Sequence, residues 1–404
     1  MTLISVAEAK ARVLDGVVPL EAERIELADA LGRVLAEDVA ATRTQPPEAV
    51  SAMDGYAVRA ADVATVPAKL TVIGAAPAGR PFAGIVEPGQ SVRIFTGGVV
   101  PQGADAIVIQ EDTETDGDSV IVKESAKPGA FVRSAGMDFR KGDVLLPQGL
   151  RLQPRHIALA AAANQAMLPV ARRARVGILA TGDELVPPGT DPGPGQIVSS
   201  NNAGIAAFAE ALGAIPIGLG IAQDTEASLA EALARAHAAD LDILVTLGGA
   251  SVGDHDLVMP ALEQAGLKRS FWRIAMRPGK PLMFGTMGTV RVLGLPGNPV
   301  STMVCARLFL RPLLAALHGW DDADDHPVPA RLAAPLGAND RRQDYLRAVL
   351  TRNADGLAEV APFGKQDSSM LATLARANCL IVRAPHAPAI AAGETVEVLM
   401  LNEA

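Results

Sequence analysis

The sequence predicts a multi-domain protein of the α/β plus β class: a central three-layer α/β domain, an inserted β-rich module and a C-terminal β-barrel. Three observations support this prediction. The chain has 404 residues, too many for one ordinary core. Strand and helix patterns alternate between residues 175 and 317, which is typical of a parallel sheet covered on both faces. Short β-type runs, punctuated by Pro and Gly, fill residues 41–145 and 328–404.

The N-terminal third predicts a helical domain interrupted by the β module. Residues 4–35 carry helical spacing that predicts two helices, the first from Val6, Ala9 and Val13 and the second from Leu27, Ala30, Leu31 and Val34. "RHIALAAAANQA", residues 155–166, predicts a further helix that packs back on them. We therefore expect an elongated helical and linker domain from residues 1–40 with 146–172, and an inserted β-rich domain from residues 41–145. Its expected strands are "KLTVIG", "SVRIFTG", "DAIVIQ" and "SVIVKES".

The central domain is expected at residues 173–322. Its predicted strands are "VGILA", "IPIGLGI" and "LDILVTL", each followed by a helical segment. "DDADDHPVPA" is typical of a solvated linker. The strands "DYLRAVL", "CLIVRA" and "ETVEVLML" then predict a small C-terminal β domain over residues 328–404.

Composition excludes several classes of function. The formal net charge of -9 argues against a general nucleic-acid binder, because nonspecific binding needs a basic face. Cys305 and Cys379 lie in apolar contexts without metal-ligand spacing, so we expect buried free thiols in a reducing compartment. No basic and apolar leader opens the sequence, and no apolar run reaches the ~18 residues that span a bilayer. We expect a cytoplasmic protein that binds neither nucleic acid nor membrane.

Two glycine-containing loops follow predicted parallel strands and should lie at the same edge of the sheet. They are "TGDELVPPG", residues 181–189, and "GGASVGDHD", residues 248–256. Glycines allow backbone N–H groups to approach an anion, and both loops carry carboxylates. Taken singly, such loops are equally typical of tight turns and helix caps. Together they indicate a phosphate held with a divalent cation.

Further clusters contain charged or turn residues in short spans. "FWRIAMRPGKPLMFG" places three cations along a strand and its turn, where an oxyanion pocket or a solvated strand edge is equally expected. "GLPGNPVSTMV" is expected to start a helix, with Asn298 as its cap and Pro299 in the first turn. In the β module, "SAMDGYAV", "IFTGG" and "RSAGMDFRKGD" are expected to form exposed turns.

Seven motifs together resemble the molybdopterin molybdenumtransferases of the MoeA type, a family that includes the C-terminal domain of gephyrin. In chain order they are "SAMDGYAV", "IFTGG", "GMDFRKGD", "ATGDEL", "TLGGASVGDHD", "RPGKP" and "LPGNPVS". The resemblance covers nearly the whole chain. It implies an elongated homodimer of four-domain subunits that converts adenylylated molybdopterin and molybdate to molybdenum cofactor and AMP, with Mg²⁺. It also suggests the molybdopterin adenylyltransferase and acceptor molybdoenzymes as partners.

The resemblance also implies roles for individual residues. Metal binding or pyrophosphate hydrolysis would fall to Asp183, Glu184, Asp254 and Asp256. Phosphate or molybdate would be held by Arg273, Arg277 and Lys280; many relatives have lysine at the first two positions. Residues of the β module would close the cleft from the other subunit: Asp54, Thr96, Arg133 and Asp138. The last domain would add oxyanion contacts from Arg347 and Ser368. Further substrate contacts would come from Thr181, Gly182, Gly248, Gly249, Ser251, Gly253, Pro296, Asn298 and Pro299.

Two alternatives stay open on the sequence. A molybdopterin adenylyltransferase of the MogA type shares the α/β domain, but it has "GGTG" where this chain has "GGAS" and it lacks the flanking β domains. A gephyrin-like scaffold is a different class of function, which could use the same groove. Molybdate and tungstate have the same shape and charge, so the sequence does not decide between them.

Overall fold

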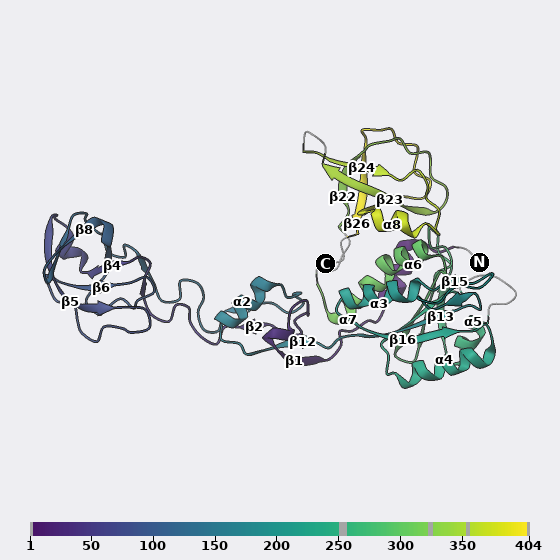
Figure 1. Cartoon of the computed structure of the whole chain (residues 1–404), viewed down its shortest axis with the longest axis horizontal. Helices are drawn as coiled ribbons and strands as arrows, with labels where there is room; N and C mark the ends of the chain where they lie inside the picture. The colour runs from purple at the N-terminus through teal and green to yellow at the C-terminus, as the bar shows by residue number, and fades with distance from the viewer. Residues whose placement is uncertain (1–2, 250–256, 322–325, 353–355, 402–404) are drawn as a thin grey trace.

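The computed structural model describes residues 3–249, 257–321, 326–352 and 356–401. The chain is elongated, with a β module at one end joined by a slender arm to an α/β domain and a β-barrel at the other (Figure 1). The arm is built from residues on both sides of the β module. The predicted multi-domain fold class is confirmed, whereas the four residue boundaries stay predictions.

Two of the predicted N-terminal helices are present. α1 (Val6–Leu14) begins at Ser5, whose side chain accepts a hydrogen bond of 3.1 Å from Glu8 N. The helix buries one apolar face in the α/β domain. α2 (Pro154–Ala162) lies in the arm, where a proline at its start supplies a suitable backbone angle. Both segments therefore form the helices that their apolar spacing predicts.

The predicted second helix, at residues 27–34, is wrong. Apart from a 3₁₀ turn at Leu27–Asp29, this part of the arm is not helical. Val34 and Leu35 form β-bridges to Arg151 and Val170, more than 100 residues away in the chain. Long-range pairing thus overrides the local helical spacing. The arm consists of residues 22–40 and 144–171, and its paired strands are β1 (Ala22–Glu26) with β12 (Met167–Ala171) and β2 (Val39–Ala40) with β11 (Val144–Leu146).

The β module contains a six-stranded sheet in the order β7-β4-β6-β5-β9-β8, with small apolar cores. All four strands predicted from the sequence are present. The segment around Tyr56, expected as an exposed loop, is instead the buried inner strand β4, which pairs with neighbours on both sides. The strands are β4 (Gly55–Val58), β5 (Ala68–Ala76), β6 (Gln90–Ile94), β7 (Ala106–Ile109), β8 (Thr113–Asp116) and β9 (Ser119–Val122), with a separate pair β3 (Val50–Ser51) and β10 (Val132–Arg133).

The α/β domain has a six-stranded sheet in the order β16-β13-β17-β21-β20-β18. The three predicted strands β16, β13 and β17 pair in parallel, and β21 continues this pairing, but β20 pairs antiparallel with both β21 and β18, so the sheet is mixed. α1, α3, α6 and α7 cover one face, and α4 and α5 cover the other. Its elements are β13 (Arg175–Thr181), α3 (Asn201–Ala211), β16 (Ile215–Ala222), α4 (Glu226–Ala238), β17 (Ile243–Leu247), α5 (Val258–Gln264), β18 (Lys268–Trp272), β20 (Met283–Met287) and β21 (Val290–Leu295).

A long apolar helix closes this domain. It comprises α6 (Pro299–Cys305), a π-helical turn (Ala306–Leu310) and α7 (Arg311–His318), and it ends at Gly319, which has φ +66°. By length and composition it could cross a membrane, but 78% of its most apolar window is buried inside the protein. It is therefore a core helix.

The C-terminal domain is a closed barrel, as predicted. The strand order β23-β24-β22-β26-β25 closes through pairing of β25 with β23. β19 (Met276–Arg277), from the α/β segment, pairs with β23 and attaches the barrel. The strand at 328–332 includes the last residues of the segment expected to be a linker. The elements are β22 (Val328–Leu332), β23 (Gln343–Arg352), β24 (Ala358–Pro362), α8 (Leu371–Arg376), β25 (Cys379–Arg383) and β26 (Thr395–Met400).

Buried polar groups include both cysteines and one histidine. Cys305 and Cys379 are buried free thiols, as expected, and burial raises the pKa of Cys379 to about 11. His318, at the end of α7, is 7% exposed and its Nε2 accepts a hydrogen bond of 3.1 Å from Ala174 N. Burial is the main reason that the pKa of His318 is lowered from 6.5 to about 4. The folded protein therefore holds this imidazole neutral.

His318 should make the α/β domain lose stability in mild acid. Its pKa is lower in the folded state, so as pH falls from about 6.5 toward 4 the unfolded state takes up a proton that the folded state does not. The loss should total roughly 3 kcal/mol at pH 4, and His318→Gln should remove that part of the pH dependence. Trp272 lies in β18 and Trp320 packs against the core of this domain, so tryptophan fluorescence in urea reports its unfolding. His237→Gln, on the exposed side of α4, is the matched control. The same pH dependence in His318→Gln and the parent would refute this assignment.

Candidate functional site

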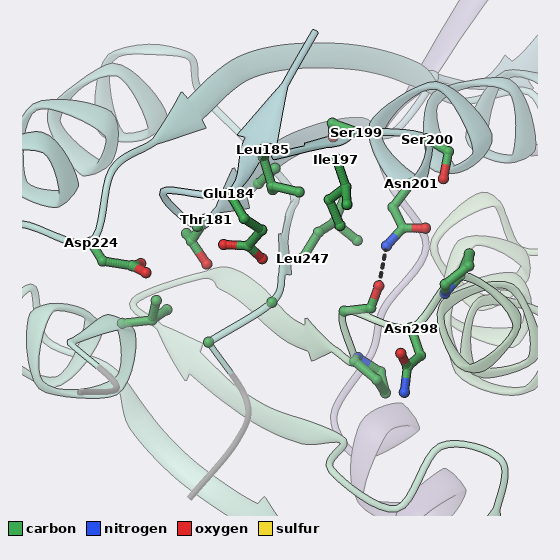
Figure 2. Close-up of a pocket in the computed structure, with 18 of the residues that line it drawn as sticks. Thr181, Glu184, Leu185, Ile197, Ser199, Ser200, Asn201, Asp224, Leu247 and Asn298 are labelled. Carbon is green, nitrogen blue, oxygen red and sulfur yellow. Dashed lines mark hydrogen bonds between the residues drawn. The ribbon is translucent and has the colours of Figure 1, made fainter. Parts of the chain in front are cut away.

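The candidate site is a cavity of about 730 Å³ at the carboxyl ends of the parallel strands (Figure 2). The loops after β13, β17 and β21 meet there, because parallel strands place these ends at one edge of the sheet. Of the predicted site residues, the cavity is lined by Thr181, Gly182, Glu184, Gly248, Gly249, Pro296, Asn298 and Pro299.

The two glycines after β17 are positions that other residues do not fit. Gly248 and Gly249 have φ of +97° and +61°. A Cβ on Gly248 would lie 2.8 Å from Thr181 O, and one on Gly249 would lie 2.3 Å from Val258 Cγ2. The backbone is therefore bare where it faces the cavity. Beside it, Thr181 Oγ1 is buried with no hydrogen-bond partner within the described chain.

The loop after β21 is held in place by neighbouring polar side chains. Thr302 Oγ1 donates to Pro296 O over 2.5 Å, and Asn201 Nδ2 donates to Gly297 O over 2.7 Å (Figure 2). Asn298 occupies the N-cap position of α6 with Pro299 next, as predicted, but its side chain makes no capping hydrogen bond to the described residues. The Asn298 amide instead lines the cavity and can contact a ligand.

Three carboxylates gather at the opposite side of the cavity. Glu184 and Asp224 line it, with Thr181 beside them (Figure 2). Asp183 lines an adjacent cavity of about 600 Å³, and its Oδ1 accepts a hydrogen bond of 3.0 Å from Asp224 N. Burial, followed by the charges of Asp183 and Glu184, raises the pKa of Asp224. This edge of the site therefore carries uncompensated negative charge that a cation would relieve.

The three predicted cations have different surroundings in the structure. The Arg273 guanidinium carbon lies 4.1 Å from the centre of the Trp272 ring, and Lys280 is exposed next to Pro281 of the cavity lining. Arg277 Nε donates to both oxygens of Asp344, over 3.0 and 3.1 Å, and this bond raises its pKa. Arg277 attaches the barrel to the α/β domain. Because the carboxylate that engages it lies 67 residues away, the sequence did not reveal this pairing.

The predicted oxyanion contacts of the last domain, Arg347 and Ser368, do not line the described cavity. Arg347 is 1% exposed, and its guanidinium donates to Gln366 Oε1 and Met370 O over 3.2 and 3.1 Å. It packs the barrel and does not line the cavity. Ser368 O accepts a hydrogen bond of 3.1 Å from Val300 N, and the neighbouring Ser369 lines the cavity instead.

The predicted residues of the β module form a separate group. Asp54 Oδ1 accepts hydrogen bonds from Thr96 N and Oγ1 over 2.7 and 2.8 Å, which lower its pKa. Arg133 lies on β10, and Asp138 N donates to Gln45 O over 3.1 Å. The module lies at the far end of the arm from the cavity (Figure 1). Within one chain, these residues do not join the site.

The remaining predicted residues, Ser251, Gly253, Asp254 and Asp256, lie outside the described residues. In the described ranges, no three His, Cys, Asp or Glu side chains are placed to hold a metal ion.

Sequence reasoning missed several residues that line the cavity. Asp224 follows β16 at the same edge of the sheet as the other loops, so the strand-end rule could have found it. Ser199, Ser200 and Asn201 lead into α3, a start that polar residues typically mark. Ile197 is 56% exposed and carried no signal in the sequence.

Comparisons with known proteins give a consistent picture. Three family models match in chain order: "MoeA N-terminal region (domain I and II)" at residues 4–164, "Probable molybdopterin binding domain" at 177–316 and "MoeA C-terminal region (domain IV)" at 329–401. The chain is 35% identical to the molybdopterin molybdenumtransferase of Haemophilus influenzae, over 99% of both chains. It is 39% identical to that of Nostoc sp., over 94% of this chain and 89% of the other. A crystal structure of the molybdopterin biosynthesis MoeA protein from Pyrococcus horikosii matches with a TM-score of 0.85 at 29% identity, over 99% of this chain and 100% of that one.

Replacing Asp224 with asparagine should stabilise the α/β domain at pH 7. The pKa of Asp224 is raised in the folded state, so its ionised form opposes folding at neutral pH, and this cost disappears as pH falls below the folded pKa. We expect a gain of about 0.5 kcal/mol in the urea transition, a size typical of partly exposed charges. The gain should vanish near pH 4. Asp191→Asn, on an exposed loop, should change little. A loss of stability at pH 7 in Asp224→Asn would contradict this interpretation.

Proposed function

Since this chain belongs to the MoeA family of molybdopterin molybdenumtransferases, which insert molybdenum into molybdopterin, we propose that it uses molybdate and adenylylated molybdopterin and releases molybdenum cofactor and AMP. The observation that carries the proposal is the meeting of bare glycine backbone at Gly248 and Gly249 with the carboxylates Glu184 and Asp224 in one cavity. Backbone N–H groups suit phosphate and oxyanion groups, and carboxylates suit a cation that accompanies them.

A Mg²⁺ ion fits the donor chemistry of this cavity. Glu184 and Asp224 offer oxygen ligands, the raised pKa of Asp224 marks uncompensated negative charge, and the Thr181 hydroxyl is buried without a partner among the described residues. Those residues hold too few converging carboxylates to bind a metal alone. Mg²⁺ commonly completes its shell with water and substrate oxygens. When bound, it would neutralise phosphate charge and make the pyrophosphate easier to cleave.

The chain's own residues bind and orient the substrates in this proposal. Gly248 and Gly249 bring the backbone close to a phosphate or molybdate oxygen without a side chain in the way. The Asn298 side-chain amide makes no capping hydrogen bond to the described residues, so it can contact a substrate oxygen. Lys280, exposed beside the cavity, supplies a mobile positive charge for an incoming oxyanion. Arg277 contributes only where the oxyanion competes with Asp344, because that carboxylate already engages its guanidinium.

We also propose that two copies form the working enzyme. Asp54 and Thr96 adjoin β4 and β6 of the β module, which lies at the far end of the arm from the α/β domain (Figure 1). A symmetric dimer allows each β module to close the cavity of its partner.

A molybdopterin adenylyltransferase and acceptor molybdoenzymes are proposed as transient partners, and a cytoplasmic location stays a prediction. The family models that match both flanking regions favour this function over a MogA-type activity.

Reconstitution tests the proposed reaction. Purified protein, adenylylated molybdopterin, molybdate and Mg²⁺ should release AMP and activate a cofactor-free molybdoenzyme. Glu184→Ala should reduce AMP release by about 100-fold or more, because the variant removes a carboxylate at the cation's side of the cavity. Glu210→Ala, exposed on α3, is the control for a lost carboxylate elsewhere in the domain. No AMP release by the parent with intact substrate would refute the proposed reaction.

Mixed dimers test the shared site. Asp54→Ala and Glu184→Ala should each be inactive. Asp54→Ala removes a carboxylate that the β module contributes to the site, and Glu184→Ala removes one that lines the cavity. Random mixing yields heterodimers with one intact site, so co-expression should recover about a quarter of the parent activity. Light scattering should give the mass of a dimer. A monomer, or mixed protein with no recovered activity, would argue against shared sites.

A further inference from the structure

The arm meets the α/β domain at a small junction. The polypeptide crosses between them in two short stretches, residues 15–21 and 172–174, and both lie at the same end of the arm (Figure 1). Two neighbouring connecting segments do not by themselves fix the angle between the arm and the α/β domain. Non-covalent contacts at the junction must therefore set it.

Arg172 and Asp242 make the most directional of these contacts. Nη1 and Nη2 of Arg172 donate to Oδ2 and Oδ1 of Asp242, each over 2.8 Å, and Nε donates to Glu21 Oε2 over 2.8 Å. Asp242 is largely buried, with a side chain 13% exposed. A planar guanidinium that engages both oxygens of a carboxylate fixes orientation as well as distance. The pair thus joins both crossings of the chain to the α/β domain.

Asp242 also belongs to the sheet that carries the cavity. Its Oδ2 accepts a hydrogen bond of 2.8 Å from Arg175 N at the start of β13, and its own N donates to Arg175 O over 3.0 Å. Asp242 directly precedes β17, the strand that Gly248 follows. One carboxylate therefore links the arm to the beginnings of two strands that lead to the site.

A second contact lies elsewhere on the junction. Arg151 of the arm donates from Nη2 to Ala211 O over 3.0 Å, and its guanidinium carbon lies 4.9 Å from the centre of the Trp320 ring. Asp321 N donates to Gly149 O over 3.2 Å. With two separate points of contact, the arm is held at an angle, whereas either point alone would act as a pivot.

We propose that the Arg172–Asp242 pair is a positioning device for the reaction: it holds the arm in the direction that brings the β module to a cavity. The inference rests on the proposed function in one respect, namely that Asp54 and Thr96 of the module take part in a shared site. The module lies at the far end of the arm (Figure 1), so a small rotation at the junction becomes a large displacement of these residues. Neither Arg172 nor Asp242 lines the cavity.

The test compares Arg172→Ala with the full-length parent in three measurements. Turnover in the reconstituted reaction should fall by on the order of 10- to 100-fold, the size expected when catalytic groups are displaced. The affinity for AMP, measured by calorimetry, should stay within about twofold, because the cavity itself is unchanged. Small-angle X-ray scattering should show a broader distribution of interatomic distances, because the arm samples several directions.

Two further variants separate positioning from general damage. Arg172→Lys keeps the charge but cannot engage both oxygens in one plane, so it should restore turnover only in part. Arg235→Ala removes an exposed arginine that pairs with Glu231 on α4, and it should match the parent in all three measurements. If Arg172→Ala fails to fold, Arg172→Lys carries the same test, with turnover reduced, AMP affinity retained and scattering broadened.

Each outcome supports or overturns the proposal. Turnover within about twofold of the parent, or a loss of turnover with unchanged scattering, would overturn it. A parallel loss of AMP affinity would also overturn it, because the pair would then act on the cavity itself. If the parent releases no AMP, the proposed reaction has failed, but scattering still decides whether the pair holds the arm.

Discussion

The structure depends on the parallel pairing of β13, β17 and β21. β17 is buried along its whole length, with Ile243 and Val245 facing one helical layer and Leu244 facing the other. Helices on both faces leave the strand ends as the place where backbone is free to meet a ligand. The three loops of the cavity are there for this reason. The same strand pairing that buries the core of this domain therefore also brings the loops of the site together.

An acidic chain that handles anions must place its positive groups carefully. Several arginines serve structural joints: Arg277 binds Asp344 between the barrel and the α/β domain, and Arg172 binds Asp242 at the arm. Arg347 is buried within the barrel. Under the proposed function, anion binding therefore falls to bare backbone at Gly248 and Gly249, a bound cation and the exposed Lys280. A site built in this way gains selectivity from geometry, because the excess of negative charge repels anions that do not fit.

Elongation has its own physical consequence. The arm carries small apolar cores of its own, such as the cluster around Leu35 and Leu168, so it does not need the α/β domain to bury its surface. Its direction then depends on a few polar contacts at the junction. Polar pairs with fixed geometry suit this task, since they define angles that nonspecific apolar contact leaves open. A long, thin chain can thus present distant residues in a defined place.

The sequence by itself determined the fold class, the family and the loops of the cavity. Strand and helix periodicity, together with the rule that parallel strand ends converge, placed Thr181, Glu184 and Gly248 at one edge, and the family resemblance added Asn298. These inferences are local, so neighbouring residues carry the whole signal. Tertiary structure alone decided that residues 27–34 are not a helix, that Arg277 faces Asp344 and that Arg347 is buried. Each of these depends on partners or packing far away in the chain, and periodicity contains no information about which distant residue an extended strand or a guanidinium will meet.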